Sequence, residues 1–301
     1  MKVAKAVMDR RTNKWSVDIE GKRIRSTKKT YIGARAAAAG YAVSFGDESS
    51  EVKPAAESKF PINTRFEFVT KLVSMVASGV QASAVITGEG GLGKTFTVTK
   101  TLDDAGYLDV SDLSALAEGT VIRKSKTYTM VKGYSTPKGL YRTLYENNGS
   151  VIVFDDCDSV LKDPVALNLL KTALDSYGKR IISWNADFRD EDLPRSFAFN
   201  GRVIFISNLN QFQIDQAIRS RSMMIDLTMT LDQKLERMEH IVKQKDFMPE
   251  FEVNEKLDAI RFIKEIKNEV NEISLRTLIS VTKIRSANTD WKDLARYILV
   301  S

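Results

Sequence analysis

Eight residues at positions 88–95, GEGGLGKT, constrain this chain more than any other segment. They follow the apolar run Ala84, Val85 and Ile86, which predicts a buried strand before the turn and a helix after it. Half of the segment is glycine, so the backbone can curl and aim successive N–H groups at one point, where the helix N-terminus adds its positive dipole end. Bulky side chains would block that approach. The segment therefore predicts an α/β unit that binds phosphate groups.

The segment satisfies the P-loop pattern of nucleotide-binding proteins. Within it, Lys94 supplies a positive charge for the β and γ phosphates, and the Thr95 hydroxyl can ligate Mg²⁺. We therefore expect ATP and Mg²⁺ as cofactors. The expected nucleotide-binding residues are Gly88, Glu89, Gly90, Gly91, Leu92, Gly93, Lys94 and Thr95.

A second apolar strand ends in acidic residues, in the run VIVFDDCD at 151–158. A carboxylate at a strand tip beside a P-loop can hold the hydrated Mg²⁺ that Thr95 also contacts, so Asp155 is the second expected metal ligand. The run resembles the Walker B strand of AAA+ ATPases, which implies that Asp156 orients and polarises the attacking water. Most members of that family carry glutamate at this position. Aspartate is one methylene shorter, so the water has to sit closer or hydrolysis is slow; some viral hexameric helicases of superfamily 3 have a similar pair of aspartates.

Two further segments resemble AAA+ motifs that surround the γ-phosphate. The run GRVIFISN contains an apolar strand at 203–206 that resembles the sensor 1 strand, which in this family lies between the P-loop and Walker B strands. Asn208 is then expected to hydrogen-bond the attacking water or the γ-phosphate. The segment 271–284 is similar to part of the AAA+ lid, where Arg276 takes the place of the sensor 2 arginine that closes over the nucleotide. Its apolar helical stripe consists of Ile273, Leu275, Leu278, Val281 and Ile284.

The segment IDQAIRSRSMMIDL at 214–227 resembles the part of clamp loaders and related motors that carries an arginine finger. In those proteins an arginine from a neighbouring subunit reaches the γ-phosphate and stabilises the charge of the transition state. Arg221 aligns best, and Arg219 is the second candidate. The resemblance implies that the active site is completed only in a homo-oligomeric ring, for which a hexamer is the expected size.

The order of these motifs predicts the fold class. We expect an α/β protein with an AAA+ P-loop domain of three α/β/α layers and a parallel sheet over residues 60–230. A helical lid is expected over residues 231–301, where only helical periodicity remains. Residues 47–59 are polar, contain Pro54 and lack periodicity, which predicts a linker. Residues 1–46 then form a separate N-terminal module.

The expected N-terminal module is strongly basic. Residues 1–35 carry eleven Lys or Arg against three acidic residues, a balance of +8, whereas the whole chain has a net charge of +6. Alternating apolar and polar residues predict three short strands, and the Ala-rich segment 34–45 predicts one helix closed by Gly46. This pattern resembles the three-stranded sheet plus helix at the N-terminus of integrases and in related plant transcription factors, whose sheet enters the DNA major groove. The resemblance implies DNA as a partner, although a solvated basic surface would carry the same charge.

Composition favours a soluble, cytoplasmic protein without a membrane partner. No apolar run approaches the roughly 18 residues that a membrane span requires. The basic N-terminus lacks the apolar stretch of a signal peptide. Cys157 is the only cysteine, which fits a reducing compartment.

Two further segments could contact the substrate of the motor, but their residues do not distinguish DNA from polypeptide. In ring-shaped AAA+ motors the loop that contains Lys132 and Tyr134 faces the central pore, where it could grip a phosphate backbone or stack on a base. Polypeptide translocases also use an aromatic residue there, and a purely structural loop is an equal alternative. The segment 179–202 could form a hairpin insertion, as in DNA-acting relatives, or Trp184 and Phe188 could be core residues.

These features together predict an AAA+ ATPase that hydrolyses ATP to drive a DNA-directed process, such as translocation, helicase loading or remodelling of DNA complexes. The alternative from another class is a protein-remodelling chaperone whose N-terminal module binds a protein partner. A third reading is a nucleotide-gated switch with slow hydrolysis, which the aspartate at position 156 permits.

Overall fold

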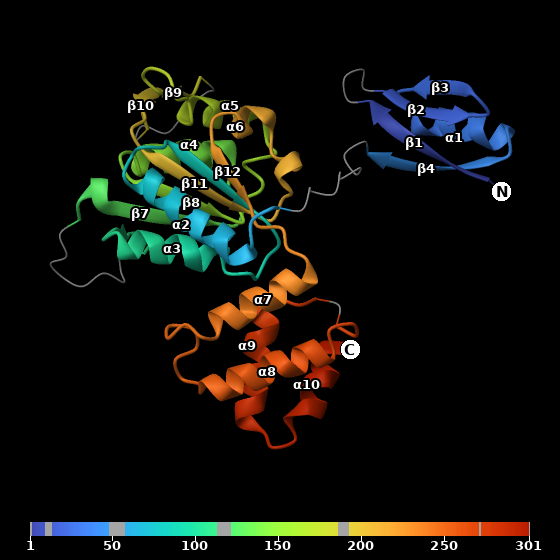
Figure 1. Cartoon of the computed structure of the whole chain (residues 1–301). Helices are drawn as coiled ribbons and strands as arrows, with labels where there is room; N and C mark the ends of the chain where they lie inside the picture. Colours follow the sequence, from blue (N-terminus) through green and yellow to red (C-terminus); the bar gives the residue numbers. More distant parts are fainter. Residues whose placement is uncertain are drawn as a thin grey trace. The chain divides into compact units, whose positions relative to one another are not determined.

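The computed structural model of the chain divides into two units, Met1–Glu57 and Ser58–Ser301 (Figure 1). The structure describes residues 2–9, 14–47, 58–112, 122–185, 193–270 and 272–300. The greater part of the expected linker, residues 48–57, lies outside the described residues.

The N-terminal unit is a four-stranded sheet with one helix. The β1–β2 and β2–β3 pairs are antiparallel, whereas β4 pairs with β1 in parallel. The buried side chains come from the central strands and from the helix, and they are Ala4, Ala6, Trp15, Val17, Ile19, Ile32 and Ala36. The elements are β1 (Lys2–Asp9), β2 (Lys14–Ile19), β3 (Lys22–Ser26), α1 (Lys29–Ala38) and β4 (Tyr41–Asp47), with the strand order β3-β2-β1-β4.

The helix expected over 34–45 is wrong, and so is the count of three strands. The helix ends at Ala38, and Gly40 then takes a φ of +80°, a left-handed conformation that glycine adopts without steric cost. The next residues form strand β4 because β1 offers them a free edge, along which all seven of them pair. The Ala-rich composition favours helix locally, but this pairing overrides the local propensity.

The second unit is built on a six-stranded sheet in which every neighbouring pair is parallel. Strand β11 lies between β5 and β8, which confirms the strand position expected for the GRVIFISN run. Ile206 pairs with Ile86 on one side and with Asp155 on the other, so the ends of these three strands meet at one edge. The strands are β5 (Ser83–Thr87), β6 (Leu108–Asp109), β7 (Thr127–Lys132), β8 (Val151–Asp155), β11 (Arg202–Ser207) and β12 (Met223–Asp226), in the order β12-β5-β11-β8-β7-β6.

Helices cover both faces of this sheet, which confirms the three-layer arrangement. Successive strand residues alternate between two apolar clusters, because neighbouring side chains on a strand point to opposite faces. One cluster, containing Val85 and Phe154, includes side chains of α4 (Pro137–Glu146) and α5 (Pro164–Ala173). The other cluster, containing Ile86 and Val153, includes side chains of α2 (Ile62–Ala77) and α3 (Lys94–Asp104).

A small hairpin precedes β11. Strands β9 (Ile181–Ser183) and β10 (Ser196–Ala198) pair antiparallel, so a hairpin does form within the segment 179–202. Trp184 also contributes to the core, because its ring lies 5.8 Å from that of Tyr141. Phe188 lies outside the described residues.

After β12 the described residues form four helices with their own apolar core, in the segment expected to be a lid, and we call this part the helical lid. The predicted apolar stripe is confirmed, since Ile273, Leu275, Leu278 and Val281 are buried and Ile284 packs against them. Among the described residues, no helix is long and apolar enough to cross a membrane. The lid helices are α7 (Leu231–Ile241), α8 (Val253–Glu265), α9 (Leu275–Ala287) and α10 (Trp291–Val300), and the short helix α6 (Gln216–Arg219) lies between β11 and β12.

Candidate active site

The glycine-rich loop connects the buried strand β5 to α3. Gly88, Gly91 and Gly93 have φ values of +135°, +69° and +91°, a range that residues other than glycine rarely adopt. At Gly88 a Cβ atom would lie only 2.9 Å from the backbone carbonyl carbon of Leu227, which follows β12. The loop conformation therefore depends on glycine at these positions. The first residue of α3 is Lys94.

Lys94 is a nearly buried cation, with 5% of its surface exposed. Its Nζ donates to the carbonyl of Gly88, to the carbonyl of Glu89 at 2.7 Å and to Oδ1 of Asn208 at 2.9 Å. Burial lowers the pKa of Lys94, and the nearby carboxylates, first of all Asp156, oppose that change. The ammonium group is therefore held at the loop, where phosphate oxygens are the acceptors that match its charge.

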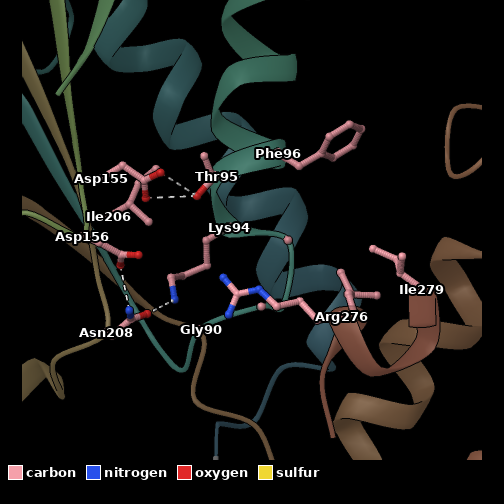
Figure 2. A pocket seen from close by; sticks show the side chains of 13 residues that line it. Gly90, Lys94, Thr95, Phe96, Asp155, Asp156, Ile206, Asn208, Arg276 and Ile279 are labelled. Carbon is pink, nitrogen blue, oxygen red and sulfur yellow. Dashed lines mark hydrogen bonds between the residues drawn. The ribbon is translucent and has the colours of Figure 1, made fainter. Parts of the chain in front are cut away.

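Thr95 and Asp155 lie together at the end of β8 (Figure 2). The Thr95 hydroxyl donates to both carboxylate oxygens of Asp155, at 3.0 and 3.1 Å. Burial raises the pKa of Asp155, while the bond from Thr95 opposes the rise. A hydroxyl and a carboxylate side by side are the hard oxygen donors that Mg²⁺ prefers, and a bound cation would favour the ionised carboxylate.

Asp156 lies next to Asp155 but is held by the neighbouring strand. Its backbone has a φ of +55°, and its N–H donates to the carbonyl of Ile206 at 3.0 Å. Its Oδ1 accepts from the side-chain amide of Asn208 at 2.7 Å. Since the Asn208 oxygen accepts from Lys94, the three side chains form one hydrogen-bonded chain. This arrangement places the expected water-orienting carboxylate beside the expected sensor 1 residue.

The lid touches the glycine-rich loop directly. The N–H of Leu275 donates to the carbonyl of Gly91 at 2.8 Å, and a Cβ at Gly91 would lie 3.1 Å from Cβ of Ser274. Lys234 of α7 forms an ion pair with Glu89 of the loop. Arg276 follows Leu275, and its guanidinium points toward the loop near Lys94 and Gly90 (Figure 2). The lid therefore supplies both a backbone contact and two cations to the same loop.

The expected catalytic, metal-binding and lid residues line one pocket of about 210 Å³, namely Lys94, Thr95, Asp155, Asp156, Asn208 and Arg276. Within the described ranges, no group of three or more His, Cys, Asp or Glu side chains is placed to hold a metal ion. The candidate Mg²⁺ ligands in this pocket are the hydroxyl of Thr95 and the carboxylate of Asp155. Gly88, Glu89 and Leu92 belong to the loop but do not line the pocket; Leu92 is buried in the core instead. The lining residues are Gly90, Gly91, Gly93, Lys94, Thr95, Phe96, Asp155, Asp156, Ile206, Asn208, Leu275, Arg276 and Ile279.

The two expected finger residues lie outside this pocket. Arg219, at the end of α6, is exposed. Arg221 is partly buried: its Nη1 donates to the carbonyl of Ala217 at 3.1 Å, and its Nε has no hydrogen-bond partner in the described part of the chain. Neither residue completes the site within its own chain.

Sequence reasoning missed several residues of the site. The Ser207 hydroxyl donates to Asp158 at 2.6 Å, which ties the strand before Asn208 to the acidic run. Lys234 and the apolar lining residues Phe96 and Ile279 were also missed. The only signal for Asp158 was its place in the acidic run, and no motif marks Lys234.

Comparison with known proteins gives distant relatives. No family model matches the chain. The chain is 28% identical over 273 residues to an uncharacterised 36.7 kDa protein from the nrdC-mobD intergenic region of Enterobacteria phage T4, across 83% of this chain and 78% of that protein. It is also similar to the crystal structure of the FIGL-1 AAA domain in complex with ADP, at 15% identity and a TM-score of 0.32. That match covers 74% of this chain and 63% of the other, so the chain spans less than two thirds of that solved structure.

Proposed function

We propose that this chain is an AAA+ ATPase that binds ATP with Mg²⁺ between the glycine-rich loop and the lid. One observation carries the proposal: a single pocket contains Lys94, Thr95, Asp155, Asp156 and Asn208, and the lid closes it with an arginine. Each group has a role in phosphoryl transfer to water, in which catalysis consists mainly of positioning and charge stabilisation. The experiment that tests it is a titration with ATP in the presence and absence of Mg²⁺, followed by measurement of phosphate release.

Some residues of the pocket bind the nucleotide and Mg²⁺, and others activate the attacking water. Lys94 exchanges its carbonyl acceptors for phosphate oxygens, and the N–H groups of the loop and of the first turn of α3 add further donors. Thr95 and Asp155 would hold Mg²⁺, which would supply positive charge to neutralise the phosphates. Asp156 orients the attacking water and accepts its proton after Asn208 releases the carboxylate. Wild-type protein that fails to bind ATP would overturn this assignment.

The active site is completed by a second copy of the chain. Neither Arg219 nor Arg221 lines the pocket of its own subunit, and Arg219 is exposed at the end of α6. A guanidinium from a neighbouring subunit stabilises transition-state charge in related reactions. We therefore propose a ring, and sedimentation in the presence of ATP tests it. A chain that stays monomeric while hydrolysing ATP at full rate would refute the ring.

DNA is the proposed partner of the N-terminal unit. Lys14, Arg23 and Arg25 are exposed on β2 and β3, whereas Trp15 and Val17 of β2 are buried. A positively charged sheet face releases counterions from DNA when it binds, so its affinity falls steeply with salt. ATPase rates without DNA, with single-stranded DNA and with duplex DNA test this partner. Stimulation by a protein substrate instead of DNA would favour the chaperone alternative.

A slow nucleotide-gated switch is the second candidate, and one observation favours it. Asp156 is both short and held by Asn208, so the carboxylate is not free to orient water in this arrangement. A switch would bind ATP tightly and turn over slowly with every partner tried. A turnover that rises at least tenfold with DNA would exclude it.

A further inference from the structure

The segment that joins the sheet to the helical lid is short and largely buried. Residues 227–230, here called the connecting segment, lie between β12 and α7. Leu227 is fully buried and Met229 is 6% exposed, and both pack in the apolar cluster that includes side chains of α2. The N–H of Leu227 donates to the carbonyl of Thr87 at 2.9 Å, directly before the glycine-rich loop. The lid is therefore attached to the sheet beside the loop that it contacts.

Arg65 of α2 binds the connecting segment and the elements on both sides of it. The residue is nearly buried, with 6% of its surface exposed. Its Nη1 donates to the carbonyl of Thr228 at 2.8 Å and to that of Asp226, the last residue of β12, at 3.3 Å. Its Nη2 donates to Oε1 of Gln233, in the first turn of α7, at 3.0 Å. A planar guanidinium serves several acceptors at fixed angles, so one side chain holds strand, connecting segment and lid in one arrangement.

The beginning of α2 makes further contacts with α7. Asn63 donates to Oε1 of Glu236 at 3.3 Å and accepts from Nη1 of Arg237 at 3.0 Å. The guanidinium of Arg237 also lies over the Phe66 ring, 3.7 Å from its centroid. A rotation of the lid about the connecting segment would break these contacts together with those of Arg65. Helix α2 is therefore the element against which the orientation of the lid is set.

We propose that Arg65 is a positioning residue for the nucleotide site, which fixes the lid so that Arg276 lies over the glycine-rich loop. The proposal rests on the function proposed above. Arg65 does not line the nucleotide pocket, so it acts on a bound nucleotide only through the lid. Because α7 and α9 share one apolar core, a tilt of α7 carries Arg276 away from the loop. A residue with a purely structural role would instead affect folding alone.

The test is a double-mutant cycle on the full-length protein, with Arg65→Lys, Arg276→Ala and the two changes combined. Lysine keeps the charge of arginine but lacks the planar fork. Calorimetry measures the affinity for the Mg²⁺ complex of a non-hydrolysable ATP analogue. We expect Arg276→Ala to weaken binding about tenfold and Arg65→Lys about fivefold, in the range of one charge-assisted hydrogen bond. The combined variant is expected to bind about as weakly as Arg276→Ala alone, because no arginine is left to position.

Arg202→Lys is the matched control. Arg202 donates to the carbonyls of Ala77 and Gly149, at the other end of α2 and at the start of β11, and it does not line the pocket. We expect this variant to lower the Tm, as Arg65→Lys does, and to leave the affinity for the analogue unchanged. Gln233→Ala removes the acceptor on the lid and takes the place of Arg65→Lys in the cycle if that variant does not fold, with an expected loss of about threefold in affinity.

Three results would overturn the positioning role of Arg65. They are an unchanged affinity in Arg65→Lys, an equal loss of affinity in Arg202→Lys, and a combined variant that binds several times more weakly than Arg276→Ala, as independent effects require. The same criteria apply to Gln233→Ala where it is used. Failure of the wild type to bind the analogue would instead overturn the proposed ATPase.

Discussion

The side-chain amide of Asn208 donates to the carboxylate of Asp156 at 2.7 Å, which ties the end of β11 to the residue that follows β8. Asp156 has a φ of +55°, a conformation that few residues with a side chain adopt. The same amide accepts a hydrogen bond from Lys94, so a phosphate that draws Lys94 away also removes one anchor of Asn208. We therefore expect nucleotide binding to loosen the hold of Asn208 on Asp156.

The variant Asp156→Asn tests the role of this carboxylate. Asparagine keeps the shape and an acceptor oxygen for Asn208, but it cannot take a proton from water. We expect ATP affinity to stay within about threefold and hydrolysis to fall about a hundredfold or more, in the usual range for a lost general base. Phosphate release and equilibrium binding measure the two quantities. Asp156→Glu is the companion variant, because it keeps a carboxylate at this position. An unchanged rate of hydrolysis in Asp156→Asn would show that Asp156 has no role in catalysis.

Asp155 should make the stability of the nucleotide-free protein depend on pH. Burial raises the pKa of Asp155, so the folded state favours the protonated form. This contribution to stability is present below the ordinary carboxyl pKa of about 3.9 and is lost as pH rises through the higher folded value. Asp155→Asn should therefore raise the Tm at pH 7 by roughly 2 °C or more, and the gain should shrink near pH 4. Thermal melts from pH 4 to 8 check this, and a lower Tm of the variant at pH 7 would contradict it.

Gly91→Ala separates backbone strain from lid contact. Gly91 has a φ of +69°, and an added Cβ would lie 3.1 Å from Cβ of Ser274 in the lid. Gly149→Ala is the matched control, since Gly149 has a φ of +91° and no atom within 4 Å of an added Cβ. Both variants should lose roughly 1–2 kcal/mol of stability from the left-handed backbone. Only Gly91→Ala should also weaken ATP binding, as measured by calorimetry; an equal effect on binding in both would rule out the lid contact as the cause.

The motifs that the sequence shows best are those that are continuous along the chain. The loop from Gly88 to Thr95 and the acidic end of β8 could be predicted because each is a strand followed at once by its functional residues. That Asn208 lies beside both the glycine-rich loop and the acidic end of β8 could be predicted only through the resemblance to AAA+ proteins. That resemblance places the strand before Asn208 between the P-loop strand and the Walker B strand. The structure confirms that strand order.

What could not be predicted depends on contacts between distant segments. The ion pair of Lys234 with Glu89 and the bond from Leu275 to Gly91 follow from how the lid packs, and no local pattern marks them. Strand β4 was missed for the same reason, since its pairing with β1 outweighs an Ala-rich neighbourhood. The difference in exposure between Arg219 and Arg221, the two candidate finger residues, also depends on packing.

Mixed subunits distinguish the two finger candidates. Arg219 is exposed, whereas Arg221, in the turn after α6, donates to the carbonyl of Ala217 in that helix. We mix Arg219→Ala, and separately Arg221→Ala, with Asp156→Asn. In a mixed ring, some sites then combine the intact Asp156 of one subunit with the intact arginine of its neighbour. The true finger variant should be inactive alone, should still bind ATP and should regain partial phosphate release in the mixture. Absence of recovery for both arginines at every mixing ratio would argue against a finger between subunits.

The N-terminal unit offers a test of DNA binding in which neighbouring arginines act differently. Arg25 pairs with Ser16 across the strands, whereas Arg23 pairs with Asp18 and its Nη2 lies 2.8 Å from that carboxylate. The Arg23 charge is thus partly neutralised before any DNA binds. Arg25→Ala should weaken DNA binding and lower the slope of log affinity against log salt by about one, while Arg23→Ala should do less. Asp18→Ala should strengthen binding, because it frees the Arg23 guanidinium for phosphate. Affinities measured at several salt concentrations decide the order, and an unchanged affinity in both arginine variants would mean that this sheet face does not contact the backbone of DNA.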